Sequence, residues 1–159
     1  MENILDKESV KRVSKVLSDF DSNLKVEVLN SSARTAVDAA QSLNCEVGAI
    51  VKSLLLRTDD NFIICLVSGD KRCSLNKIKK IINKKDVSMA NADQVKSQTG
   101  FSIGGVSPVA HLKKIKVLID LSFARYENVY AAAGHPNSIF KITYKRLVKL
   151  TEGKEKDIV

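Results

Sequence analysis

The chain has 159 residues, with 26 lysines and arginines against 18 acidic residues and a formal net charge of +8 at pH 7. A hydrophobic content of 44% and this length suit a globular protein with one domain, which we expect to span residues 1–159. No apolar run approaches the roughly 18 residues of a membrane-spanning helix. The first residues lack the basic and apolar regions of a signal peptide. We therefore expect a cytoplasmic protein without membrane association.

The cysteines argue against a disulfide framework or a zinc site. Cys45, Cys65 and Cys73 are odd in number and form no CxxC pair. Cys65 lies in the apolar run 62–67 and is predicted to be a buried small hydrophobic residue. The basic residues just before Cys73 would lower its pKa, but with no histidine nearby in the sequence we favour an incidental surface thiol. We predict no metal.

The basic excess points to phosphate-bearing partners. It is concentrated in segments 77–85, 113–116 and 141–149. Only 5% of the residues are aromatic and tryptophan is absent, which argues against a stacking platform for long single strands. Contact with the backbone of a structured RNA fits better. The alternative is a solvated lysine surface without a binding role.

Apolar periodicity and capping residues predict five helices. The first covers 6–20 with Asp6 as its N-cap, and the second covers 36–43 with Thr35 as its cap. The others cover 74–82, 92–99 with Gly100 at the end, and 144–150.

The strands are predicted from β-branched runs bounded by turn residues. The two apolar runs 48–57 and 62–67 flank a short polar turn and predict a hairpin of central strands. Other strands are expected at 25–29, 87–89, 117–120, 128–132, 139–142 and 156–159. Helices and strands are interspersed without a regular βαβ rhythm, which predicts an α+β domain with a mixed, partly closed sheet.

Lys52 interrupts the apolar strand 49–56. A lysine inside a central strand needs an anionic or polar partner, because its desolvation otherwise costs several kcal/mol. We favour an ammonium that emerges into a pocket and binds a phosphate or a polarised carbonyl. The alternative is a lysine whose stem lies along an exposed face of the sheet.

Two further segments have the composition of binding loops. The loop 100–108 carries adjacent glycines, Gly104 and Gly105, whose backbone N–H groups can approach a ligand closely, although a plain turn explains it as well. It lacks the GxGxxG and GxxxxGK patterns, so no nucleotide cofactor is predicted. The segment 131–137 contains His135, which is a candidate base or hydrogen-bond donor, but a lone histidine is more often structural. No HExxH, GxSxG or Cys–His pattern indicates a zinc or covalent hydrolase.

Taken together, these motifs resemble the YbaK/EbsC family, the editing domains associated with prolyl-tRNA synthetase. The resemblance covers nearly the whole length and rests on the order and spacing of four segments: Arg34-Thr-Ala-x-x-Ala-Ala40, Ile50-Val-Lys-Ser-Leu-Leu55, Gly100-Phe-Ser-Ile-Gly-Gly-Val-Ser-Pro108 and Ala132-Ala-Gly-His-Pro-Asn137. It implies a mixed sheet curled around a buried helix, which agrees with the alanine-rich helix at 36–43. Many relatives have a glycine after the loop proline where this chain has Ala110, so a differently shaped loop exit is expected.

The resemblance also implies an activity: hydrolysis, in trans, of the ester of mischarged tRNA, here tRNA for proline carrying a small or polar wrong amino acid. It assigns Lys52, Gly104 and Gly105 to catalysis. It assigns substrate binding to Thr35, Ser53, Ser107, Pro108, Gly134, His135 and Asn137. The acceptor end of tRNA is the expected partner, with prolyl-tRNA synthetase as a second one. The alternative is a catalytically silent tRNA-binding module of the same fold.

The lysine clusters supply the expected RNA contacts. Non-specific binding of an acceptor stem needs cations near phosphates rather than base-specific side chains. The candidates are Lys77, Lys79, Lys80, Lys113 and Lys114.

Overall fold

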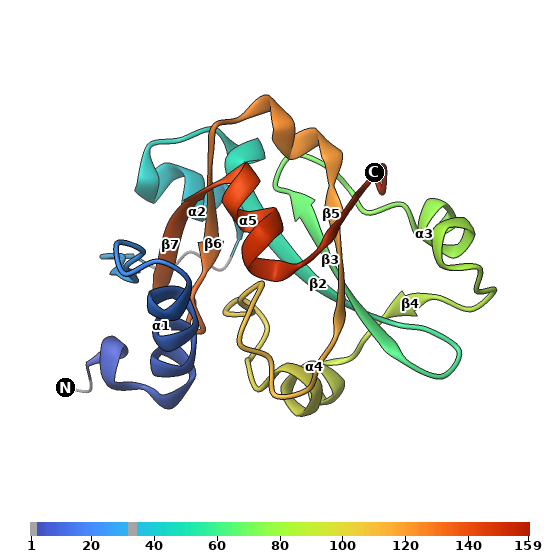
Figure 1. Ribbon diagram of the computed structural model, residues 1–159, viewed down its shortest axis with the longest axis horizontal. Coiled ribbons are helices and arrows are strands. Elements are labelled where there is room, and N and C mark those ends of the chain that lie inside the picture. The colour runs from blue at the N-terminus through green and yellow to red at the C-terminus, as the bar shows by residue number, and fades with distance from the viewer. Residues whose placement is uncertain (1–2, 32–34) are drawn as a thin grey trace.

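A mixed sheet runs through the molecule, with the hairpin of β2 (Ile50–Arg57) and β3 (Phe62–Ser68) at its middle (Figure 1). The computed structural model describes residues 3–31 and 35–159, and these contribute eight strands. The other strands are β1 (Glu27–Val28), β4 (Ser88–Met89), β5 (Lys116–Asp120), β6 (Asn128–Ala132), β7 (Ser138–Thr143) and β8 (Lys154–Lys156). Their order is β1-β7-β6-β2-β3-β5-β8, and β4 pairs with β2 beside this path.

Parallel and antiparallel pairs occur in the same sheet, which confirms the α+β class. β2 is antiparallel to β3, with Lys52 opposite Val67, and β6 is antiparallel to β7. β2 is parallel to β6, β3 to β5, and β5 to β8. The two-strand hairpin needs only the short turn that the sequence predicts, whereas the parallel pairs require longer connections through helices.

The helices are α1 (Glu8–Phe20), α2 (Ala36–Leu43), α3 (Leu75–Ile82), α4 (Ala92–Thr99) and α5 (Tyr144–Thr151). Side-chain oxygens cap four of them as the N-cap preference predicts: Thr35, Ser74, Asn91 and Thr143 accept backbone N–H groups of α2, α3, α4 and α5. The prediction that Asp6 caps α1 is wrong. Asp6 ends a separate 3-10 turn, and the extended Lys7 precedes the helix.

The core has clusters on both faces of the sheet, because alternate residues of β2 and β3 point to opposite faces. The largest cluster combines Val51 and Leu55 with residues of α1, α4 and α5. A second cluster packs Leu56 and Cys65 against Ile78 of α3. A third is formed by Ile50 with the alanines of α2.

The expected identity of the enclosed helix needs a correction. The alanine-rich α2 buries Ala39 and Ala40 but leaves Val37 52% exposed, so it covers a face of the sheet and is not enclosed. α5 is the more enclosed helix, because only Lys145 and Lys149 among its residues are exposed. Figure 1 shows α5 lying over the middle of the sheet.

The C-terminal strand is displaced from its predicted position. It covers Lys154–Lys156 and not 156–159. The apolar residue of the last segment, Ile158, is fully buried in the α3 cluster, and its carbonyl accepts the N–H of Ser74 at 2.7 Å. Burial of Ile158 therefore ends the strand, because the chain turns into the core.

The two cysteines of the α3 cluster lie together. Cys65 is fully buried, as predicted. Cys73 is half-buried against the same cluster, so the expectation of an incidental surface thiol is wrong. A hydrogen bond with the Cys65 thiol and the charge of Lys52 lower the pKa of Cys73. The basic residues that precede Cys73 in the sequence are not the cause.

Candidate functional site

The central feature of the site is an interruption in the pairing of β2. β6 pairs with β2 only at Ile50 and Val51, and β4 pairs with it only at Leu56 and Arg57. Residues 52–54 therefore face a gap between two partner strands along this edge. A cavity of about 380 Å³ occupies the gap. Its lining comes from α2, from Val95 of α4, from β2, β4, β6 and β7, and from the glycine-rich loop.

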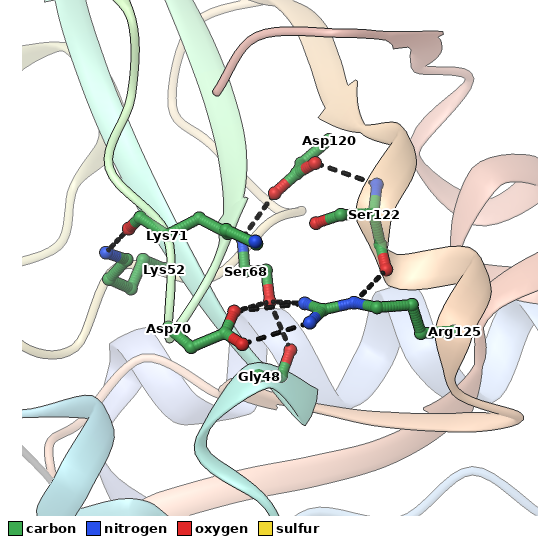
Figure 2. Close-up of polar contacts among 8 residues, drawn as sticks. All are labelled: Gly48, Lys52, Ser68, Asp70, Lys71, Asp120, Ser122 and Arg125. Carbon is green, nitrogen blue, oxygen red and sulfur yellow. Dashed lines mark hydrogen bonds and ion pairs between the residues drawn. The ribbon is translucent and has the colours of Figure 1, made fainter.

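Lys52 lies in the lining of this cavity and is half-buried. Its ammonium donates a hydrogen bond to the backbone carbonyl of Lys71 at 2.5 Å (Figure 2). Burial lowers the pKa of Lys52, and the nearby groups Cys73 and Asp70 oppose this shift. Among the described residues, the ammonium therefore binds a neutral acceptor and forms no direct ion pair.

Ser53 lines the same cavity with an unusual hydroxyl. Its Oγ is buried and has no hydrogen-bond partner among the described residues. A buried polar group without a partner costs about 1–3 kcal/mol. The carbonyl of Leu55 accepts the N–H of Ala90, so by strand alternation the backbone groups of Ser53 face the same edge. A polar ligand in the cavity would supply hydrogen-bond partners to the hydroxyl and to the backbone groups of Ser53.

The glycine-rich loop lines the cavity with Ile103, Gly104 and Val106, and Gly104 has φ +92°. Gly105 instead supports the loop, because its N–H donates to the Ser102 carbonyl at 3.0 Å and closes a turn. A Cβ at Gly105 would stand 3.0 Å from the backbone of His135, so glycine permits the close approach of the two loops. Of the two predicted backbone donors, the structure places only Gly104 in the lining.

The loop exit is held behind the cavity. Ser107 and Pro108 are buried and do not line the cavity. The carbonyl of Ser107 is 2.7 Å from Nε2 of His111, and burial lowers the pKa of that histidine. Ala110 has φ +65°, the left-handed region that glycine favours, and its carbonyl accepts from Nε of Arg12 at 3.0 Å. Ala110 thus adopts the backbone conformation that a glycine would favour at this position. The backbone at Ala110 therefore gives no support to the expectation of a differently shaped loop exit.

The segment 134–137 contacts the cavity only through Pro136. Gly134 has φ +98° and packs against α1, where Ser9 donates to its carbonyl at 2.9 Å. Nδ1 of His135 accepts the N–H of Asn137 at 3.0 Å, and the Asn137 carbonyl accepts from Leu29. These contacts shape the turn that presents Pro136.

Thr35 lies both at the cavity and at the N-terminus of α2. It lines the cavity, and its Oγ1 accepts the N–H of Asp38 at 3.1 Å as the N-cap. The neighbouring Arg34, which belongs to the same sequence motif, lies outside the described residues.

The predicted RNA-contacting lysines do not belong to the cavity lining. Lys77 is bound by Asp157 at 2.9 Å and by the carbonyl of Val159 at 2.5 Å. Lys79 and Lys80 share α3 with it, and Lys113 and Lys114 lie between α4 and β5. In Figure 1, α3 lies at the opposite side of the molecule from α2.

Sequence reasoning missed much of the cavity wall. Met89, Ala90, Ile103 and Tyr130 line it from three separate segments. Their residue types occur throughout any core, so no local pattern distinguishes them. Only the pairing of strands brings them to the gap.

No group of three or more histidine, cysteine, aspartate or glutamate side chains among the described residues could hold a metal ion. No helix in the described ranges is long and apolar enough to cross a membrane.

Comparisons with known proteins define the class of this fold and cavity. The family model for the aminoacyl-tRNA editing domain matches residues 30–150, and the chain belongs to this family. A crystal structure described as that of a proposed trans-editing enzyme for prolyl tRNA synthetase superposes with a TM-score of 0.90 at 37% identity. It covers 96% of this chain and 97% of that one.

Sequence relatives divide into short and long proteins. The Bacillus subtilis protein YwhH is 29% identical over 92% of this chain and 93% of its own length. The proline–tRNA ligase of Thermosipho africanus is 29% identical over 64% of this chain, but over only 18% of the ligase. The fold therefore occurs both as a separate chain and as a small part of proline–tRNA ligases.

We predict that Thr35→Ala destabilises the protein by about 1 kcal/mol through loss of the α2 cap. Thr35→Ser keeps the capping oxygen and should cost less. Ser74→Ala removes the equivalent cap from α3. Because Ser74 does not line the cavity, this variant is the matched control for the loss of a helix cap. Urea denaturation measures all three. Equal stability of Thr35→Ala and wild type would show that the cap contributes nothing.

Proposed function

We propose that this chain is an aminoacyl-tRNA deacylase that acts in trans on tRNA for proline carrying a small or polar wrong amino acid. The observation that carries the proposal is the cavity at the gap in β2, where Lys52, Ser53 and Gly104 meet in the lining. Membership of the editing-domain family and the similarity to a proposed trans-editing enzyme support it. Because charged tRNA is used in translation, we also propose that the protein works in the cytoplasm.

Hydrolysis of an aminoacyl ester requires correct positioning of the reacting groups more than it requires a strong base. An aminoacyl ester is already activated, so the site must hold the carbonyl, a water molecule and the developing negative charge. The Lys52 ammonium and the backbone N–H of Gly104 are our candidates for stabilising that charge. The 2′-hydroxyl of the terminal ribose can position the attacking water. Water attack forms the tetrahedral intermediate, and its collapse breaks the ester bond and releases the amino acid and the free tRNA end.

Selectivity follows from the size of the cavity. Small side chains, Ala36, Ala39, Ala131 and Ala132, form part of its wall, among larger apolar neighbours. One methylene group in such a pocket changes binding by about 1–3 kcal/mol. We therefore propose that small amino acids enter and that proline is excluded by its ring.

The RNA body would be held by charge. The net charge of +8 favours association with phosphates, and the lysines of α3 and of the segment before β5 are the proposed contacts. Among them Lys77 already binds Asp157, so its part in RNA binding would require exchange of that partner. Prolyl-tRNA synthetase is the second proposed partner.

The test uses tRNA for proline charged with alanine, serine, cysteine, threonine or proline, with release of the amino acid as the readout. We expect hydrolysis of at least one of the first four and none of the proline ester. Lys52→Met should lower kcat about 100-fold or more, because one stabilising donor is lost. Lys154→Met, an exposed lysine on β8, is the matched control and should keep the wild-type rate.

Near-normal turnover by Lys52→Met would remove Lys52 from the catalytic site. If the wild type binds tRNA but releases no amino acid from the panel, the alternative of a silent tRNA-binding module is correct. Thermal unfolding of each variant shows whether a lost rate reflects a lost fold.

A pH profile tests the charge state of Lys52. Burial lowers the pKa of this residue, so the ammonium should lose its proton below the ordinary lysine value of about 10.4. If the protonated form is the active one, kcat/KM falls as the pH rises through this lowered pKa. The rate is measured against spontaneous ester hydrolysis at each pH. An enzymatic rate that keeps rising past pH 10 would contradict the requirement for a charged Lys52.

A further inference from the structure

A dense polar cluster stands beside the cavity without lining it. Its members lie at the ends of β3 and β5 and in the 3-10 turn Leu121–Arg125, and they are here called the β3-exit network: Ser68, Asp70, Asp120 and Arg125 (Figure 2). None of them belongs to a motif that the sequence singled out. We propose that the β3-exit network positions Lys52 for the reaction by fixing the carbonyl of Lys71.

Asp120 is the buried centre of the network. Its side chain is fully buried, and its two carboxylate oxygens accept the N–H groups of Ser68 at 3.0 Å and of Ser122 at 2.8 Å. Buried carboxylates are costly unless they are hydrogen-bonded. The bond from Ser68 therefore ties the end of β3 to the end of β5, and the bond from Ser122 caps the 3-10 turn that follows β5.

Arg125 is the partly exposed member of the network and binds Ser68 and Asp70. Its guanidinium makes two bonds to the Asp70 carboxylate, both 3.0 Å, and one to Ser68 Oγ at 2.8 Å. Its Nε donates to the Ser122 carbonyl at 2.7 Å. The hydroxyl of Ser68 in turn donates to the carbonyl of Gly48 at 2.5 Å. With its donors engaged in this way, Arg125 is suited to hold a turn and not to bind a phosphate.

The turn that the network holds is the one that contacts Lys52. The N–H of Lys71 donates to the Ser68 carbonyl at 2.9 Å, and the Lys71 carbonyl accepts from the Lys52 ammonium at 2.5 Å. At Gly69 a Cβ would stand 2.2 Å from the carbonyl oxygen of Val47, so the turn is also packed tightly on its other side. Ser68 is thus linked to the ammonium through Lys71, by one backbone hydrogen bond and one hydrogen bond from the Lys52 side chain.

The proposal rests on the proposed function, because positioning matters only if Lys52 acts on the substrate. None of the four network residues lines the cavity, so we assign them no contact with substrate. A displaced catalytic group can lose about 100-fold in rate from a shift of 1 Å. A positioning role therefore predicts a loss in kcat with little change in KM.

The chain offers a matched control for Arg125. At the far end of β2, Arg57 binds Asp86 at 3.1 Å and Ser88 Oγ at 2.8 Å, which repeats the arginine, aspartate and serine contacts of the network. The two arginine side chains are similarly exposed, 39% and 36%. Arg57 does not line the cavity. Each arginine replaced by alanine thus loses one surface ion pair and one hydroxyl contact, and Arg125→Ala also loses a second bond to Asp70 and the bond to the Ser122 carbonyl.

We expect Arg125→Ala to lower kcat about tenfold or more, and Arg57→Ala to stay within about twofold of wild type. Asp70→Asn removes the charge of the side chain and keeps its size. This variant replaces Arg125→Ala in the test if Arg125→Ala does not fold. Equal effects of the Arg125 and Arg57 variants would overturn the positioning role.

A second readout does not depend on catalysis. Lysines are methylated reductively with ¹³C-formaldehyde, and the Lys52 resonance is assigned with Lys52→Arg. A dimethylated ammonium keeps its charge and one N–H donor for Lys71. We expect the Lys52 signal to move toward those of exposed lysines in Arg125→Ala and to stay in place in Arg57→Ala. An unmoved signal in Arg125→Ala contradicts the proposal, whereas a moved signal in a protein without deacylase activity contradicts only the proposed function.

Discussion

The gap along the edge of β2 is the constraint on which the site depends. β6 pairs with the first two residues of the strand and β4 with its last two, which leaves the middle unpaired on that edge. Backbone groups inside a protein need partners, so an unpaired edge is stable only if something else meets it. Here the unpaired edge faces a cavity, and the unpartnered Ser53 hydroxyl lies in the lining of that cavity.

The second constraint acts on charge. Strand alternation places Ser53 on the same face as Val51 and Leu55 of the large core cluster and Lys52 on the other face, where the carbonyl of Lys71 in the turn after β3 accepts its ammonium. The carbonyl of Lys71 accepts from the ammonium, and the partly buried network of Ser68, Asp70, Asp120 and Arg125 lies next to that turn. The ammonium of Lys52 is thus connected to groups that do not line the cavity.

Much of the fold could be predicted, because its elements carry local signals. The helix over 92–99 and the strand over 128–132 match the structure residue for residue, since an N-cap and a terminal glycine mark the ends of the helix and Gly134 and Pro136 follow the strand. Where such signals competed, prediction failed. Asp6 has the chemistry of an N-cap, yet Asn3 caps a separate turn first, and the burial of Ile158 shifts the last strand.

The site was predictable only in part. Lys52 could be found because a charged residue inside an apolar strand is conspicuous. Gly104 could be found because it is one of two adjacent glycines. Gly105, Gly134 and His135 carry the same kind of signal, but the structure places them where loops and helices contact each other, outside the lining. Asp120 and Arg125 gave no signal, because the partners that join them to the turn after β3, Ser68 and Asp70, are more than 50 residues away in the sequence.

The most direct test of the central claim is binding of a stable substrate analogue, 3′-deoxy-3′-alanylamido-adenosine, followed by backbone amide NMR. Because the amide resists hydrolysis, the measurement is independent of turnover. The account predicts that the largest shifts fall on Ser53, Gly104 and Ala132, around the gap in β2. Saturable binding with its shifts confined to α3, with these three amides unmoved, would contradict it.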